Sequence, residues 1–145
     1  PDVFDDTELE LGLDADIDAA DAAGDFDEVN RLEAWMWLDG PAAPEGRVAG
    51  PMRDLFLDMN GKALRANDPG DWIALVPPAW DRLPDIAVPT LVLVGDLDLT
   101  RQQTRSAMLA ELIPKAELVQ LSGVAHLPHL EADPTCLDAI VAFLS

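Results

Sequence analysis

Two short apolar runs in the second half of the chain predict buried β-strands. The first, Thr90 to Val94, is uninterrupted and rich in β-branched residues, which is typical of a parallel strand covered on both faces. The second is Glu117 to Leu121. The segment between them, from about Thr100 to Ile113, has helical apolar spacing, and Thr100 is its expected N-cap. This order of strand, helix and strand predicts a parallel pair with a right-handed crossover.

A last helix is predicted after Asp133, which can act as its N-cap, with Pro134 at the first helical position. The apolar residues that follow recur at the spacing of one helical face. They are Leu137, Ile140, Val141 and Leu144. We expect this face to pack on the sheet.

Helical periodicity also marks two segments of the first half. One ends near Asp39, and the other begins at Pro51. The apolar positions are Phe26, Val29, Leu32, Trp35 and Met36 in the first segment and Met52, Leu55, Phe56, Met59 and Ala63 in the second. Residues 67–71 predict a loop. The pair Pro77-Pro78 marks the boundary at which the chain would enter the sheet, so we divide the chain into a helical region, residues 1–77, and a sheet region, residues 78–145.

An acid and a histidine follow the two predicted strands. Asp98 comes shortly after the first strand, and His126 comes shortly after the second. Because ligands gather beyond the carboxyl ends of parallel strands, we expect both side chains at the same edge of the sheet. A carboxylate bonded to Nδ1 of a histidine fixes the ring tautomer and stabilises the imidazolium that forms during proton transfer. Asp96 is the rival acid, one residue past Gly95.

These motifs resemble the C-terminal half of an α/β-hydrolase. The resemblance covers residues 83–144 and runs through IAVPTLVLVG, then GDLD, then GVAHLP. Acid before histidine is the order of that family. Carried over residue by residue, the resemblance places the catalytic acid at Asp98 and the base at His126. More weakly, GDFDEVNRLEAWMWLDGP, within residues 24–66, resembles the lid of bacterial α/β-hydrolases. The implied fold is α/β, the C-terminal part of a parallel sheet with flanking helices, preceded by a helical lid.

The activity that the resemblance implies is hydrolysis of a small, fairly apolar carboxylic ester, lactone or related acyl substrate, without a cofactor. Trp37, Leu99 and Leu127 are the expected pocket residues. The G-x-S-x-G turn that carries the nucleophile in this family is absent. The serines are Ser106, Ser122 and Ser145, and none lies between glycines at that spacing. We expect a serine outside this chain to be the nucleophile, and Ser122 to shape a turn.

Two other interpretations remain open. An aspartate nucleophile, as in epoxide hydrolases and dehalogenases, would use the same histidine and acid. Alternatively, the chain is a non-catalytic fragment of the fold. In every case two strands that are apolar on both faces cannot cover themselves. We expect the fold to be completed by a missing N-terminal half or by another chain.

Composition limits the partners and the compartment. The chain has 28 acidic and 9 basic residues and a net charge of -19, so nucleic acid and anionic membranes are poor partners. Alternate aspartates at residues 14–21 lack the glycine and glutamate of a calcium loop. His129 has no expected role, and two histidines without a helical HExxH motif predict no metal site. A lone cysteine, Cys136, predicts a buried thiol and fits a reducing cytoplasm. No apolar stretch is long enough to span a membrane.

Overall fold

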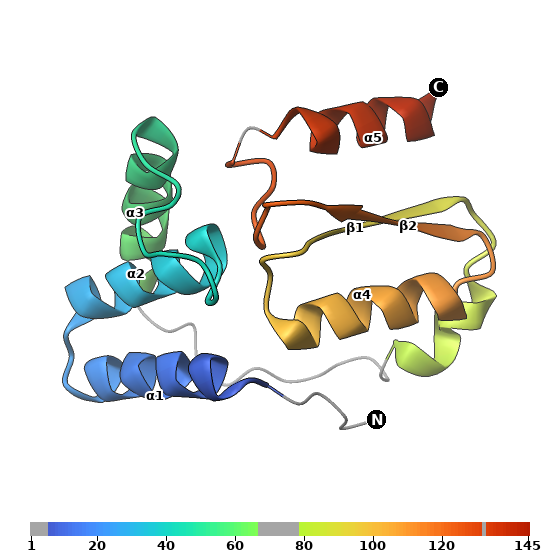
Figure 1. Cartoon of the computed structure of the whole chain (residues 1–145). Coiled ribbons are helices and arrows are strands. Elements are labelled where there is room, and N and C mark those ends of the chain that lie inside the picture. Colours follow the sequence, from blue (N-terminus) through green and yellow to red (C-terminus); the bar gives the residue numbers. More distant parts are fainter. Residues whose placement is uncertain (1–5, 67–78, 132) are drawn as a thin grey trace.

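The computed structural model of the chain describes residues 6–66, 79–131 and 133–145. The elements are the helices α1 (Glu8–Ala22) and α2 (Phe26–Ala34), the π-helix η1 (Trp35–Asp39), α3 (Pro51–Leu64), the 3-10 helix η2 (Trp80–Asp85), β1 (Thr90–Gly95), α4 (Thr100–Leu112), β2 (Ala116–Leu121) and α5 (Pro134–Leu144). They form two groups (Figure 1). We call residues 6–66 the helical part and the described residues from 79 onward the sheet part. The predicted loop at residues 67–71 and the predicted boundary at Pro77 lie outside the described residues.

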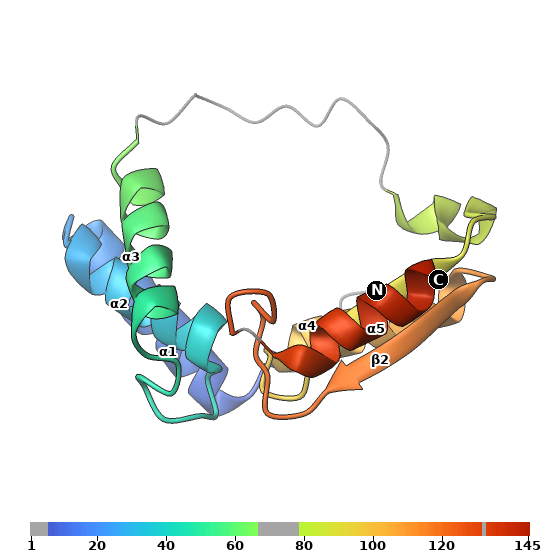
Figure 2. The same ribbon diagram turned by 90° about the horizontal axis from the view of Figure 1, so that it is seen from above.

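The sheet part contains the two predicted strands. β1 and β2 pair in parallel, with Thr90 beside Ala116 and Gly95 beside Leu121. Helix α4 lies on one face of the pair and α5 on the other, as both views show (Figures 1 and 2). The predicted strands and their parallel pairing are therefore confirmed, with each strand one residue longer than the apolar run suggested. Their predicted burial is corrected, because only the last residues of the strands, Val94 and Gly95 in β1 and Leu121 in β2, are buried.

Helix α4 begins one position earlier than its predicted N-cap implied. Leu99 occupies the N-cap position and its side chain makes no capping hydrogen bond. The N–H of Thr100 instead donates to Oε1 of Glu10, at 2.5 Å. Glu10 also closes a capping box with Thr7 at the start of α1. One carboxylate thus serves the N-termini of two helices that lie far apart in the sequence.

Two apolar clusters hold the helical part together and connect it to the sheet part. The first cluster joins α1, α2 and η1 to the loop after β1. Its buried members are Leu13, Ala20, Val29, Leu32, Met36 and Leu99. The second joins η1 and α3 to the loop after β2. Its members are Ala34, Leu38 and Phe56, with Val48, Leu57, Leu127 and Leu130 packed against them. The helical part therefore contacts both loops that carry the predicted acid and histidine.

Two predicted apolar faces are largely exposed, and for α5 this corrects the expectation that the face packs on the sheet. On α3 only Phe56 of the predicted apolar stripe is buried, while Met59 is 59% exposed. On α5, Leu137 is 62% and Leu144 is 76% exposed, and Cys136 is the buried residue of that helix. The periodicity was read correctly, but no second layer lies against these faces among the described residues. The buried thiol of Cys136 is confirmed.

The helices of the described segments are all too short or too polar to cross a bilayer.

Candidate functional site

Residues 96–99 connect β1 to α4, and we call them the acid loop. The side chain of Asp98 is only 5% exposed, and its Oδ2 lies 2.9 Å from Nδ1 of His126. The other oxygen, Oδ1, accepts from the N–H of Leu99 at 2.8 Å. Both oxygens of the buried carboxylate are therefore engaged, which is what burial of a charged group requires. The predicted pairing of Asp98 with His126 is confirmed.

His126 lies in the loop after β2, which we call the histidine loop, and its ring is partly open to solvent. The side chain is 38% exposed, whereas the preceding residue, Ala125, is fully buried. The indole of Trp37, from η1, lies against the imidazole with ring centroids 4.9 Å apart and planes tilted by 55°. With Nδ1 at the carboxylate, Nε2 is the ring nitrogen that remains for proton transfer to a reacting group.

Asp96, the rival acid, has a different role. Its Oδ1 accepts from the N–H of Gly123 at 2.6 Å, and its Oδ2 accepts from the hydroxyl of Ser122 at 3.0 Å. Asp96 therefore ties the turn after β1 to the turn after β2. The same bonds place Ser122 in a turn, as the sequence predicted.

Gly95 allows the two loops to approach each other closely. A Cβ atom at this position would lie 1.9 Å from the carbonyl oxygen of Val124 and 2.5 Å from that of Ala125. Both contacts are to backbone, which cannot move without displacing the histidine loop. The glycine that ends the apolar run is therefore required by the geometry of the site as well as by the end of the strand.

The helical part also touches the acid loop through a glycine. Gly40, at the end of η1, has φ of 92°, and a Cβ there would lie 2.4 Å from the carbonyl oxygen of Leu97. A non-glycine residue would be disfavoured both by its backbone conformation and by this contact. Together with Glu10 at the N–H of Thr100, this contact fixes the acid loop from the helical side.

Asp39, predicted only as the end of a helical segment, is the centre of a buried polar network. The residue has no exposed surface. Its carboxylate accepts from the N–H groups of Gly46 and Val48, both at 2.8 Å, and pairs with Nη1 of Arg53 at 2.7 Å. These partners satisfy a charge that would otherwise be costly to bury. The polar residues between η1 and α3 gave no periodic signal that could have revealed this network.

The three predicted pocket residues lie in different surroundings. Trp37 stands beside the imidazole, as described above. Leu127 is partly buried and borders an open apolar groove of about 300 Å³ that also includes Phe56, Met59 and Leu130. Leu99 has no exposed surface and lies in the core between the helical part and the acid loop. The structure thus places Leu99 in the core instead of at a pocket wall.

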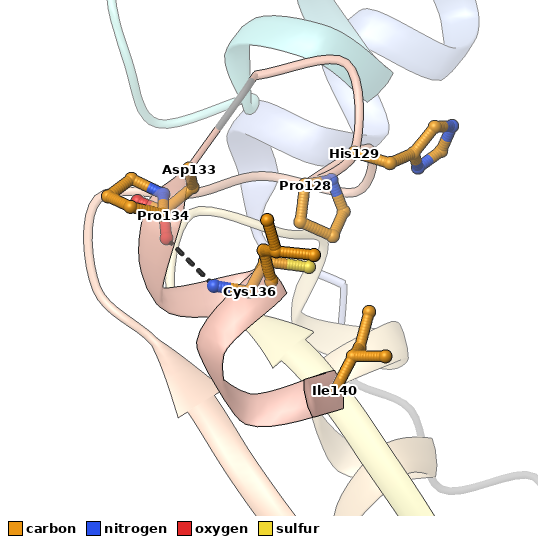
Figure 3. Close-up of a pocket in the computed structure, with 7 residues that line it drawn as sticks. Pro128, His129, Asp133, Pro134, Cys136 and Ile140 are labelled. Atoms are coloured by element: carbon orange, nitrogen blue, oxygen red, sulfur yellow. Dashed lines mark hydrogen bonds between the residues drawn. The ribbon is translucent and has the colours of Figure 1, made fainter. Parts of the chain in front are cut away.

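A larger pocket, about 460 Å³, lies between the loop that carries His129 and the first turns of α5 (Figure 3). It is lined by Pro128, His129, Asp133, Pro134, Cys136, Leu137 and Ile140, and so includes neither Asp98 nor His126. Burial raises the pKa of the Cys136 thiol, and the nearby charge of Asp133 raises it further. The thiol stays protonated at neutral pH, so this pocket does not present an activated nucleophile.

Within the described segments, no group of three or more histidine, cysteine, aspartate or glutamate residues is arranged to hold a metal ion.

Comparison with known proteins identifies the fold. No family model and no curated protein matches the sequence. Among solved structures, MenH from S. aureus matches 92% of this chain with 23% identity and a TM-score of 0.58, and the match covers 50% of MenH. A bromoperoxidase from Bacillus anthracis matches 93% of this chain at 18% identity and a TM-score of 0.59, over 49% of its own length.

A third solved structure is Est816, described as an N-acyl homoserine lactone degrading enzyme. It matches 94% of this chain at 23% identity and a TM-score of 0.57, over 54% of its own length. All three are α/β-hydrolase fold proteins, and the chain spans about half of their length. The chain therefore has the α/β-hydrolase fold over that length, and its two parallel strands with their flanking helices correspond to the C-terminal part of the fold.

Proposed function

We propose that this chain supplies the acid and the base of a hydrolase active site, Asp98 and His126. The observation that carries the proposal is the 2.9 Å contact between Oδ2 of Asp98 and Nδ1 of His126. It lies at the carboxyl ends of two parallel strands, with the carboxylate buried and the imidazole partly exposed. This is the arrangement that acyl transfer needs from a general base and its orienting acid.

In the proposed reaction, the hydroxyl oxygen of the nucleophile attacks the acyl carbon of the substrate while Nε2 of His126 takes the proton of that hydroxyl. Asp98 holds the ring in the required tautomer and stabilises the imidazolium. The same proton then passes to the leaving alcohol oxygen, and an acyl-enzyme ester remains. His126 next activates a water molecule that hydrolyses this ester and regenerates the nucleophile.

The proposed substrate is a small, fairly apolar carboxylic ester, lactone or related acyl compound. Trp37 beside the imidazole and Leu127 on the apolar groove are the side chains we propose to contact it. The likeness to a lactone-degrading enzyme is compatible with this class, but one fold hosts many chemistries. The side chains around His126 therefore carry the substrate proposal.

The proposed partner is the segment that supplies the nucleophile, either an N-terminal half or a separate chain. It would pair with the edge of β1 that β2 does not occupy and would cover the exposed face of α5. We retain the cytoplasm as the proposed compartment because the buried lone thiol of Cys136 fits reducing surroundings.

The test is kinetic and uses the chain assembled with the segment that carries the nucleophile. Asp98→Asn should keep the fold and lower kcat by up to about 10⁴-fold, and His126→Ala should lower it at least as far. His129→Ala is the control for the ring chemistry. His129 borders the same groove as Leu127, so any effect of this variant should fall on KM, and kcat should change by less than about twofold. The assay is a panel of short p-nitrophenyl esters, with melting temperature measured in parallel.

The outcomes separate the alternatives. Loss of activity in His129→Ala with activity kept in His126→Ala would refute the proposed site. Turnover of epoxides or haloalkanes instead of esters, together with G-x-D-x-G in the nucleophile segment, would favour an aspartate nucleophile. A well-folded assembly that turns over none of these substrates would favour a non-catalytic role.

A further inference from the structure

The guanidinium of Arg47, in the loop between η1 and α3, bridges the helical part and the histidine loop. On the helical side, Nε donates to the carbonyl oxygen of Asp39 at 2.6 Å and Nη2 to that of Leu38 at 2.9 Å. On the other side, Nη1 donates to the carbonyl oxygen of Gly123 at 2.9 Å and pairs with Oε2 of Glu131 at 2.7 Å. One side chain therefore contacts the end of η1 and both ends of the loop that contains His126.

Glu131 carries this contact to the residue before the histidine. Its Oε2 pairs with Arg47, while its Oε1 accepts from the N–H of Ala125 at 2.6 Å. The Glu131 side chain is 5% exposed and that of Arg47 is 23% exposed. Because the Glu131 carboxylate is almost fully buried, removal of Arg47 would leave that charge without its partner.

We propose that Arg47 and Glu131, which we call the loop clamp, are positioning residues for His126. They hold the backbone on the N-terminal side of the histidine so that Nδ1 meets Asp98. They also couple this alignment to the position of the helical part relative to the loop that contains His126. The consequence for catalysis rests on the proposed function, whereas the consequence for alignment does not.

The geometry of arginine is essential to the loop clamp. Three nitrogens of one planar guanidinium meet acceptors in two separate segments, the end of η1 and the loop that contains His126. Lysine would preserve the charge near Glu131, but a single ammonium cannot span these acceptors. Charge alone would therefore restore only part of the alignment. Arg47→Lys separates the contribution of the planar guanidinium, with its several donors, from that of the positive charge.

The alignment can be measured without turnover, because the sequence contains only two histidines. In the His129→Ala background, a single imidazole remains. Its Nδ1 proton, held by the Asp98 carboxylate, should give a slowly exchanging low-field signal in proton NMR, and Asp98→Ala should abolish it. The measurement is made on the chain alone and on the assembly with the nucleophile segment. Absence of the signal from the unchanged chain in both would overturn the pairing and the loop clamp together.

Four variants test the loop clamp itself. Arg47→Ala and Glu131→Ala should each broaden or remove the signal, and Arg47→Lys should restore less than half of its intensity. Glu131→Gln keeps an acceptor for the Ala125 N–H but removes the charge that pairs with Arg47, and should fall between Glu131→Ala and the unchanged chain. The double variant Arg47→Ala with Glu131→Ala should lose no more than either single variant, as expected for two residues that act as one unit. Full intensity in Arg47→Ala would overturn the proposal.

Arg53 provides the matched control for a merely structural role. It pairs with Asp39 within the helical part, and it also donates to the carbonyl oxygen of Val48, which lies in the same part. Arg53→Lys and Arg53→Ala should reduce the hydrogen-exchange protection of η1 while the His126 signal falls much less than in the Arg47 variants. The comparison is made between Arg53 and Arg47 variants that lower the hydrogen-exchange protection of η1 by the same amount. Equal loss of the His126 signal in the two would overturn the positioning role.

Kinetics on the assembly give the last readout. Arg47→Ala should lower kcat by about 10- to 100-fold, because small misplacement of a reacting group has effects of this size, and should change KM by less than about threefold. If the unchanged assembly has no activity, the proposed function fails while the NMR result still decides the positioning role. If the assembly is active and Arg47→Ala changes KM alone, the positioning role fails while the proposed function stands.

Discussion

The helical part and the sheet part bury their apolar side chains to very different degrees. In η1 and the end of α2, Ala34 and Leu38 have no exposed surface, and Met36 is 1% exposed. In the sheet part, α4 contains no buried residue and α5 contains only Cys136. A helical group can cover its apolar stripes within itself, but a parallel sheet needs layers on both faces and neighbours at its edges. Among the described residues, the centre of the helical part at η1 and the end of α2 is therefore covered, whereas the two helices of the sheet part are not, and neither is the outer stripe of α3.

The largest expected effect concerns completion of the sheet part. Alone, the chain should show slow amide hydrogen exchange in α2 and η1 and fast exchange in β1, β2 and α5. Binding of the completing segment at 10⁴ times its Kd should slow exchange in the sheet part by about 10⁴-fold, and should change α2 and η1 much less. Hydrogen-exchange mass spectrometry measures both parts in one experiment. A sharp two-state melt of a demonstrated monomer, with equal protection in the two parts, would contradict this picture.

The elements of this comparison could be predicted from the sequence far better than their contacts. Apolar runs located β1 and β2, and the acid-then-histidine order placed Asp98 and His126 at one edge of the sheet. Burial of the α5 face was predicted wrongly, because periodicity identifies an apolar face but does not show what lies against it. Contacts such as Arg47 with Gly123 join residues 76 positions apart, and no local pattern indicates them.

Glu10 shows the same limit for buried polar groups. The pattern of threonine followed three residues later by glutamate, at Thr7 and Glu10, is a recognisable start signal for a helix. It predicts the local bond to Thr7. It does not predict the second bond, to the N–H of Thr100, since that contact depends on how α1 packs against the acid loop.

A substitution within the helical part should have the next largest effect. Asp39→Ala removes a fully buried carboxylate and leaves the guanidinium of Arg53 without its partner, so the free energy of local opening in η1 and α3 should fall by about 3–5 kcal/mol. Asp58→Ala is the control, because its pair with Lys62 is largely exposed, and should cost less than about 1 kcal/mol. Native-state hydrogen exchange gives both values. Similar losses for the two variants would show that the network around Asp39 contributes little.

The smallest expected effect is the pH dependence of the contact between α1 and the acid loop. Burial raises the pKa of Glu10, but hydrogen bonds from Thr7 and Thr100 outweigh it, so the pKa lies below its ordinary value of 4.5. A carboxyl whose pKa is lowered by folding stabilises the fold fully above its unfolded pKa, and this contribution is lost as the pH falls through the folded value.

Glu10→Gln keeps the shape of the side chain but not its charge. At pH 7 it should lower the free energy of local opening at the start of α1 and α4 by about 1 kcal/mol, the difference between charged and neutral hydrogen bonds. The difference between the two proteins should shrink as the pH falls through the lowered pKa of Glu10, because both side chains are then neutral. Hydrogen exchange from pH 3 to 7, corrected for the intrinsic pH dependence of exchange, measures this difference.

Glu8→Gln, an exposed change in the same first turn, is the control, and its effect on the free energy of local opening should stay within about 0.5 kcal/mol throughout. If the Glu10→Gln difference were the same at pH 3 and pH 7, the charge of Glu10 would not be what holds α1 to the acid loop.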